Sequence, residues 1–280
     1  MIWKPITLLL LTAGAVSVAL GLMPRETCRN DVCVHARKAD GTTVLTAVNG
    51  FAHAPIAFSL DLSSRGVAVR RIEAPVTLAP GERRTVAALS PRDADWTYSY
   101  EYLWRPGPHA ARHDRNAIYR LPVPAGRRFH VAQSCNGRFT HHGKDRYAID
   151  LGMPPGTPVH AARAGRVIDA VDGFGPGKPD PGYRDRANAV RVLHADGTIG
   201  LYTHLRAGGV AVGVGDEVAA GDVVGYSGNS GFSAGPHLHF EVYTLDRDLD
   251  RRTIKVRYRT ERGVERCPEA GRKTGLPNGP

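Results

Sequence analysis

Apolar residues alternate with polar ones along much of this chain, and this period of two limits its fold more than any other feature. Side chains two residues apart point to the same face of a β-strand, so alternation is typical of strands with one buried face. The even-numbered positions from Ile56 to Leu62 form one such series, and those from Trp96 to Trp104 form a second. Long helical patterns are absent, and 32 glycines and 20 prolines favour short strands joined by turns. We therefore predict an all-β or mainly β protein.

The alternating segments fall into two regions. Residues 28–104 are expected to form a small N-terminal β-sandwich accessory domain, because several short strands are separated by turn signals such as Pro80-Gly81. Residues 105–117 are rich in Pro, Gly, His and Arg and are expected to be a linker. The second β-rich region covers residues 118–260. Its clearest predicted strands are Val167–Val171, Ala189–His194, Ile199–Leu205 and Leu238–Tyr243.

Two further segments have few apolar residues at regular spacing. Gly173–Arg186 is rich in Pro and Gly, which is typical of an insertion, and we expect a mobile loop there. Residues 261–280 form a basic C-terminal tail, which we expect to be loose apart from Cys267.

The N-terminus predicts the compartment. After Lys4, the run Ile6–Met23 has 18 residues without charge and is mostly apolar, as in a bacterial export signal. An uncleaved anchor in the inner membrane is the alternative, because this length is near the lower limit for spanning. Residues 1–23 are thus predicted to be a signal peptide or anchor. Either way the rest of the chain is expected in the periplasm or cell envelope, secreted or anchored.

Four cysteines agree with export, because an even number in an exported chain suggests disulfides. They allow three pairings, of which we favour Cys28–Cys33 with Cys135–Cys267. The alternative is that one or more of them is free and buried. A zinc site built from cysteines is not expected, since the chain has no second close pair.

The formal net charge of +10 favours an anionic partner, such as nucleic acid, a membrane surface or an acidic wall polymer. The sequence contains no zinc knuckle, helix-turn-helix or RNA-binding sheet signature. We therefore do not expect nucleic acid as a partner.

Histidines and one carboxylate gather in four short segments of the second region. On a strand, His237, His239 and Glu241 share one face, and two positions are roughly 6.5–7 Å apart. This spacing suits one histidine that binds a metal and another that faces the metal-bound substrate. A second strand is expected to place Tyr202 and His204 on one face. The other two segments are Ala148–Val159, which contains Asp150, and Phe139–His142.

Two histidines and one carboxylate around an open position are a catalytic zinc arrangement, because the free position can hold a water. Zinc lowers the pKa of that water and polarises a carbonyl, while nearby neutral histidines can take or give protons. The chain shows these segments together with further ordered ones: Asp150–Ala161, Ala164–Val167, Asn188-x-Val190, Tyr202-x-His204-Leu205, Gly215–Gly221, Gly225–Gly231 and Gly235–Val242.

In this order the segments, from about Gln133 to Tyr243, resemble the lysostaphin/LytM zinc metallopeptidases, which cut peptide bonds in peptidoglycan. The resemblance implies a β-rich domain with a groove over an antiparallel sheet. It also implies that Asp150 and His239 are Zn²⁺ ligands and that His204 and His237 are catalytic.

The first histidine ligand departs from the family pattern, which often reads His-x-x-x-Asp. A literal copy exists in His141 and Asp145, but only Asp150 is followed by an apolar residue and a Pro-Gly-Thr-Pro-Val turn. We therefore expect His141, Asp150 and His239 as ligands, with His142 as the alternative to His141.

Two other matched residues, Asn188 and Tyr202, are weaker candidates. They are expected to position the substrate or support the site, and their alternative roles are a turn and packing.

The resemblance implies a zinc endopeptidase acting on peptidoglycan stems or cross-links. The alternative is a non-enzymatic regulator that binds and activates other wall hydrolases, although such relatives lose ligands and all five positions are filled here. A secreted protease that cuts Gly-rich protein would have the same fold and site.

Overall fold

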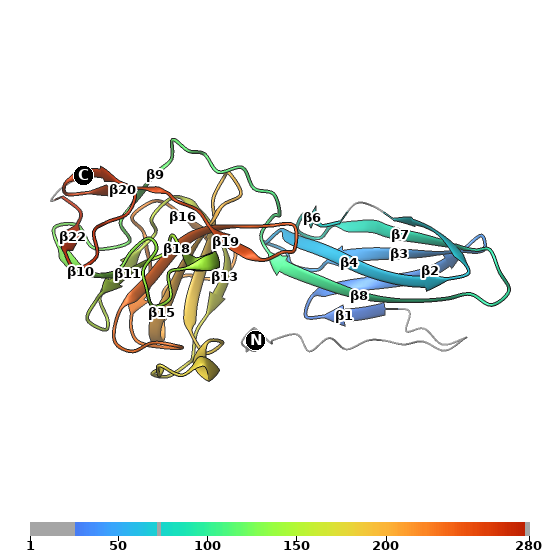
Figure 1. The fold of residues 1–280 in the computed structure, drawn as a ribbon, viewed down its shortest axis with the longest axis horizontal. Coiled ribbons are helices and arrows are strands. Elements are labelled where there is room, and N and C mark those ends of the chain that lie inside the picture. Colours follow the sequence, from blue (N-terminus) through green and yellow to red (C-terminus); the bar gives the residue numbers. More distant parts are fainter. Residues whose placement is uncertain (1–25, 72–73, 278–280) are drawn as a thin grey trace. The chain divides into compact units, whose positions relative to one another are not determined.

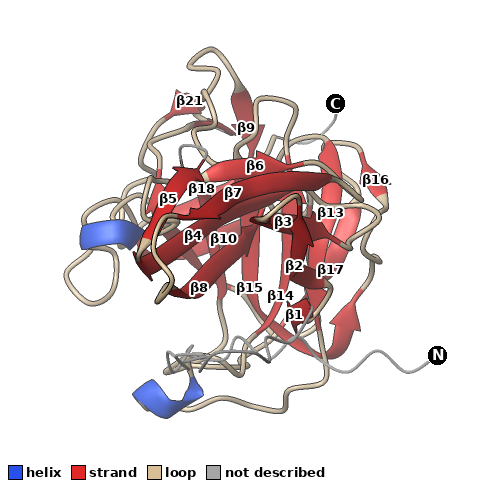
Figure 2. Ribbon diagram, turned by 90° about the vertical axis from the view of Figure 1, so that its right-hand side faces the viewer, coloured by secondary structure: helices blue, strands red, loops and turns tan. Residues whose placement is uncertain are grey.

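The computed structural model describes residues 26–71 and 74–277, and almost all of their regular structure is β-strand (Figure 1). Within these residues the helical elements are two single-turn 3-10 helices, η1 (Gly143–Asp145) and η2 (Pro181–Tyr183) (Figure 2). The prediction of a mainly β protein is therefore confirmed. The predicted signal or anchor, residues 1–23, lies outside the described residues. Among the described residues, no helix is both long and apolar enough to span a membrane.

The chain divides into two compact units, the first of which ends at Ala110 and also includes Leu245–Asp250. Its strands are β1 (Glu26–Arg29), β2 (Val32–Ala39), β3 (Thr42–Asn49), β4 (Ile56–Arg65), β5 (Val67–Arg71), β6 (Val76–Leu78), β7 (Arg83–Pro91) and β8 (Thr97–Pro106). They form a five-stranded sheet, β1-β2-β3-β7-β5, and a three-stranded sheet, β6-β4-β8. Val34 and Leu45 of the first sheet share one buried core with Phe58 and Tyr102 of the second. This unit is the predicted sandwich, although β8 runs two residues into the predicted linker.

The second unit contains Ala111–Thr244 and the chain from Arg251. Its strands are β9 (Ile118–Arg120), β10 (Arg128–Gln133), β11 (Ile149–Gly152), β12 (Pro158–His160), β13 (Gly165–Val171), β14 (Asn188–Leu193), β15 (Ile199–Val210), β16 (Glu217–Val218), β17 (Val223–Ser227), β18 (Leu238–Leu245), β19 (Arg251–Thr253), β20 (Arg257–Thr260), β21 (Gly263–Glu265) and β22 (Lys273–Gly275). An eleven-stranded sheet has the main order β16-β13-β14-β15-β18-β11-β10-β22, and β21-β20-β9 form a three-stranded sheet.

The register in the middle of the large sheet separates core from site. Phe240 of β18 pairs with Tyr202 of β15 and with Ile149 of β11, and all three side chains are fully buried. One position along, His239 pairs with Asp150, so these two side chains point to the opposite face. Fully burying a large apolar side chain contributes about 1.5–3 kcal/mol. A slip by one residue would exchange the two faces, so burial of the apolar row fixes where His239 points.

Two segments are more ordered than expected. The Gly173–Arg186 segment, which was predicted to be a mobile loop, contains η2 and is tied by backbone bridges from Pro176 and Lys178 to a second loop, at Ser230 and Phe232. Composition cannot reveal such bridges, because they join backbone groups.

The expectation of a loose C-terminal tail is wrong. Strand β21 pairs with β20, and β22 pairs with β10, where Phe129 faces Thr274. Pairing along a free sheet edge uses backbone groups, so the polar composition of the tail does not prevent it. The favoured disulfides, Cys28–Cys33 and Cys135–Cys267, are both present in the structure.

We predict that loss of the Cys135–Cys267 disulfide destabilises the second unit. The bridge joins residues 132 positions apart, and removing a native disulfide costs about 2–5 kcal/mol. Cys135→Ser/Cys267→Ser should therefore lower the denaturant midpoint of this unit, measured by circular dichroism. Of the three tryptophans, Trp96 and Trp104 lie in the sandwich unit and Trp3 in the predicted signal or anchor, so the transition seen by tryptophan fluorescence should not move. An unchanged midpoint in both signals would contradict a stabilising role.

Candidate metal centre

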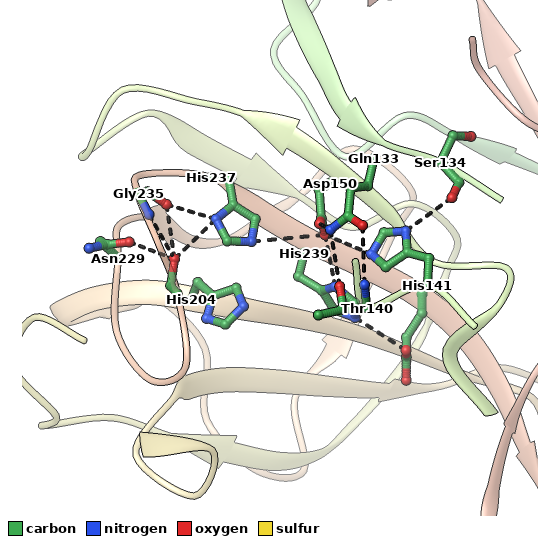
Figure 3. Close-up of polar contacts among 12 residues, drawn as sticks. Gln133, Ser134, Thr140, His141, Asp150, His204, Asn229, Gly235, His237 and His239 are labelled. Carbon is green, nitrogen blue, oxygen red and sulfur yellow. Dashed lines mark hydrogen bonds and ion pairs between the residues drawn. The ribbon is translucent and has the colours of Figure 1, made fainter. Parts of the chain in front are cut away.

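Three side chains from separate parts of the second unit converge on one point. Asp150 of β11 and His239 of β18 are direct cross-strand partners, and His239 Nδ1 lies 2.9 Å from Asp150 Oδ1. His141 lies on the loop after β10, and its Nε2 is 3.1 Å from the same carboxylate oxygen (Figure 3). These residues form a group whose ligand atoms all lie within 4.8 Å of one another. The structure thus brings together the three predicted ligands.

Residues at the start of the loop that carries His141 hold the rest of the loop by hydrogen bonds. Nδ1 of His141 lies 3.1 Å from the Ser134 carbonyl, which can only accept, so the proton is on Nδ1 and the Nε2 lone pair faces Asp150. The Gln133 amide donates to Asp150 Oδ2 at 2.7 Å and to Thr140 Oγ1 at 3.0 Å, which links the loop to the carboxylate.

Close packing inside this loop favours a glycine at position 137. A Cβ at Gly137 would lie 3.1 Å from the Ser134 carbonyl oxygen and 3.3 Å from His141 Cβ. His142, the alternative ligand, is exposed and precedes η1.

The other face of His239 is held by a second carboxylate. Nε2 of His239 lies 3.2 Å from Glu241 Oε2, and Glu241 is fully buried. Arg251 Nε lies 3.0 Å from Glu241 Oε1, and the same guanidinium donates to Asp145 at 2.6 Å. Asp145 therefore lies at the outer end of this network. It is not one of the three residues whose ligand atoms meet. With Nε2 directed at Glu241, Nδ1 of His239 faces Asp150 and is the atom that would bind a metal.

The electrostatics of this group favour a cation at its centre. Burial alone would raise the pKa of Asp150, but the adjacent imidazoles of His141 and His239 outweigh it and hold the pKa well below its usual range. Burial alone would lower the pKa of His239, yet hydrogen bonds with Asp150 and Glu241 raise it to about 10. Two carboxylates therefore stabilise positive charge on the imidazole between them.

The donor set fits Zn²⁺. Within the described residues, the buried Nε2 of His141 makes no hydrogen bond of good geometry, although Asp150 lies close to it. Two imidazole nitrogens and one carboxylate oxygen that face a common point are the ligand types of a zinc site once the ligating nitrogens lose their protons, and this set leaves a fourth position open. His141, Asp150 and His239 are the residues that would hold the ion.

A β-bulge brings His204 to the same face. Ala189 of β14 pairs with Thr203, but Asn188 pairs with Leu205, so His204 is the extra residue of β15. Its φ of 67° lies in the left-handed region, which breaks the alternation of side chains. The His204 ring lies 4.5 Å from that of His237, measured between centroids. The expectation that Tyr202 shares a face with His204 is therefore wrong.

Both of these histidines are neutral and have a defined tautomer. Burial, followed by the neighbouring imidazoles, lowers the pKa of His204 to about 3, and burial also lowers the pKa of His237. Nδ1 of His204 lies 2.6 Å from the Ser230 carbonyl, and Nδ1 of His237 lies 2.8 Å from the Gly235 carbonyl. Carbonyls only accept, so both Nε2 atoms carry a free lone pair. His237 Nε2 is 3.9 Å from Asp150 Oδ1 (Figure 3).

The two weaker candidates lie outside this cluster. Tyr202 is fully buried in the core, and its hydroxyl accepts a hydrogen bond from the Ala162 N–H at 2.8 Å. Asn188 is also fully buried and donates to the carbonyls of Leu205 at 3.1 Å and of Phe174 at 2.8 Å. Asn188 therefore holds the backbone of the bulge that directs His204.

Sequence reasoning missed the residues that orient the predicted ones. Glu241 was placed on the face of His239 but given no role, although its alternation was the available signal. Gln133, Ser134 and Arg251 carry no comparable signal, because each reaches the site through a loop or a different strand.

A hollow of about 410 Å³, lined by residues 132–139 and 267–270, borders the loop of His141.

Comparison with known proteins assigns this domain to a family. Residues 144–251 match the profile of "Peptidase family M23". The chain therefore contains a domain of peptidase family M23, and the resemblance to the lysostaphin/LytM type is confirmed.

Curated relatives match over the same part of the chain. An "Uncharacterized metalloprotease" of Buchnera aphidicola subsp. Baizongia pistaciae is 30% identical over 141 residues, which are 49% of this chain and 34% of that protein. "DD-carboxypeptidase/endopeptidase Mpg" of Neisseria meningitidis serogroup B is 37% identical over 125 residues, 44% of this chain and 24% of that protein. "Lysostaphin" of Staphylococcus simulans is 35% identical over 102 residues, 36% of this chain and 18% of that protein. The chain thus spans about a third or less of the length of these relatives.

We predict that Asp150 is required for zinc and that Asp145 is not. Asp150→Asn should lose stoichiometric zinc, because too few donors remain for tight binding. Asp145→Asn should keep it, since that carboxylate faces Arg251. Metal content after dialysis, measured by mass spectrometry, checks both. Zinc lost from the Asp145 variant but kept by the Asp150 variant would reverse the assignment.

A second prediction concerns Glu241, which orients His239 without facing the metal. Glu241→Gln keeps the side-chain shape but removes the charge, and loss of such an outer partner costs about 10–100-fold in metal affinity. Competition with a chromophoric chelator measures this affinity. Glu217→Gln, which loses an exposed ion pair with Arg166, is the control and should bind zinc as the wild type does. Equal affinity in the two variants would rule out the orienting role.

Proposed function

We propose that this protein is a zinc-dependent endopeptidase that hydrolyses peptide bonds in the stems or cross-links of peptidoglycan. The observation that carries the proposal is the convergence of His141, Asp150 and His239 beside two neutral histidines, His204 and His237. The names of the relatives Mpg and lysostaphin support the same substrate class. The proposed partner is thus a peptidoglycan peptide.

The proposed chemistry divides between the metal and the chain. When bound, zinc supplies a Lewis acid that polarises the scissile carbonyl and lowers the pKa of a water. His204 and His237 offer unprotonated Nε2 atoms, so one can accept the proton of the attacking water and later give it to the leaving amine. While it holds that proton, the same ring can donate a hydrogen bond to the oxygen on which negative charge develops, and the Nε2 of the other ring can accept a hydrogen bond from the attacking water. The carbonyls of Ser230 and Gly235 keep both rings in orientation.

The proposed location is the bacterial cell envelope or periplasm, because peptidoglycan lies outside the cytoplasm. Two disulfides agree with an oxidising compartment. Secretion by a cleaved signal, or attachment to the inner membrane by an uncleaved one, stays a prediction from residues 1–23.

The test is digestion of purified peptidoglycan fragments by the full chain, with and without a chelator, followed by mass spectrometry. We expect new amine and carboxyl termini at one type of peptide bond, and their loss on chelation. The alternative of a non-enzymatic regulator makes the opposite prediction, that a zinc-loaded chain cuts nothing. Cleavage of Gly-rich protein in place of wall fragments would support the secreted protease.

We predict that His204→Ala and His237→Ala each keep the zinc ion but lose cleavage. Neither residue is among the converging donors, and a positioned acid or base typically contributes about 100- to 10,000-fold in rate. Metal content and the rate of wall cleavage are measured on the same preparation. His160→Ala is the control, because the His160 ring hydrogen-bonds the Gly221 carbonyl and is not one of the proposed catalytic histidines. This variant should cleave at the wild-type rate. Wild-type rates in the His204 and His237 variants would remove their catalytic roles.

A further inference from the structure

Four cations surround the loop next to the catalytic histidines, and each is stacked on an aromatic ring. All four side chains are exposed, and their charged groups lie 5.2–5.7 Å from ring centroids. We call them the cationic cluster: Lys178 and Arg186 over Tyr183, Arg184 over Phe232, and Arg206 over Tyr226.

The inserted segment that carries three of these cations is locked to the loop of residues 228–233. The Lys178 N–H donates to the Gly231 carbonyl at 3.1 Å, and its own carbonyl accepts from the Ser233 N–H at 3.2 Å. A Cβ at Gly177 would lie only 1.8 Å from the Gly231 oxygen, so this approach requires glycine. The cations therefore have a fixed position relative to that loop.

The same loop contacts both catalytic histidines. The Ser230 carbonyl lies 2.6 Å from His204 Nδ1, and Ser233 Oγ lies 3.2 Å from His237 Nδ1. Arg206 follows His204 by two residues. The cationic cluster is thus attached to the histidine end of the site, away from the loop of His141.

The positive charges of the cluster are not neutralised locally. Among the described residues none of the four forms an ion pair, whereas Arg163 pairs with Asp196 at 2.8 Å in the same unit. The inserted segment has two carboxylates of its own, and Asp180 accepts from the Gly182 N–H, while Asp185 pairs with none of the four cations. Stacking on a ring holds a guanidinium in place and leaves the N–H groups at its edge free. These N–H groups can bind a carboxylate with two parallel hydrogen bonds.

We propose that Lys178, Arg184, Arg186 and Arg206 form a subsite for a free carboxylate of the substrate peptide, so that the enzyme prefers acidic stem peptides. This proposal rests on the proposed function, since it assumes that the peptide passes the catalytic histidines. Its chemistry requires an anion on the substrate close to the scissile bond.

The test compares two cross-linked peptides that differ in one property, free or amidated side carboxylates. For Arg184→Gln/Arg186→Gln we expect KM for the acidic peptide to rise about tenfold, with kcat unchanged, because exposed charge contacts act on binding. KM for the amidated peptide should not change. Added salt should weaken the preference of the wild type in the same direction. An equal effect on both peptides, or none on either, overturns the proposal.

Arg257→Gln/Arg259→Gln is the matched control, because it removes the same charge from β20, which belongs to the three-stranded sheet. It should leave both KM values unchanged. If it raises KM as much as the cluster variant does, general charge attraction explains the preference and the subsite is disproved.

Binding separates this proposal from the proposed function. Labelled acidic and amidated peptides are titrated into the full chain with chelator present, so that nothing is cut. A preference for the acidic peptide that disappears in Arg184→Gln/Arg186→Gln supports the subsite even if the wild type cleaves neither peptide. Equal binding of the two peptides overturns it even if cleavage is efficient.

Competition by small anions tests the chemistry of the ligand. Glycerol phosphate and acetate are each used to displace the acidic peptide. If glycerol phosphate displaces it at a far lower concentration than acetate does, the subsite binds phosphate and the proposal is overturned.

Discussion

The pairing of Asp150 with His239 across β11 and β18 is the contact on which the site depends. It joins residues 89 positions apart, and its register is fixed by the apolar row one position away, where Phe240 packs between Tyr202 and Ile149. Packing in the core thus determines the position of a polar pair on the other face. A protein interior is close-packed and resists small shifts, so this arrangement gives the ligands a rigid base.

Charge extends this constraint outward. His239 lies between Asp150 and Glu241, Glu241 faces Arg251, and Arg251 faces Asp145. Signs alternate along the series, so each buried charge has an opposite neighbour and the desolvation of each is offset. On the opposite side, burial lowers the pKa of His204 and of His237 and keeps both rings neutral, while backbone carbonyls fix their orientation. One sheet face therefore carries a charged half and a neutral half.

Alternation in the sequence was enough to predict the strands and the faces of His237 and His239, because both follow from local periodicity. The choice of Asp150 over Asp145 came from the family pattern, because only Asp150 is followed by the matching Pro-Gly-Thr-Pro-Val turn. The bulge at His204 could not be predicted, since it depends on the register between β14 and β15 and on Asn188 in its interior. The strands of the tail and the partners of Glu241 were also missed, because these contacts are distant in sequence and lack a local pattern.

The pairing of β22 with β10 has a consequence for the order of assembly. Residues 273–275 pair with residues 128–130 of β10, and Cys267 forms a disulfide with Cys135, one residue after the carbonyl that holds His141. The loop of the first histidine therefore cannot be completed until residues 267–275 have been synthesised. Contacts this distant in sequence also form slowly. A chain that crosses a membrane unfolded would thus complete its metal-binding loop only after the whole polypeptide has arrived, which delays activity during transit.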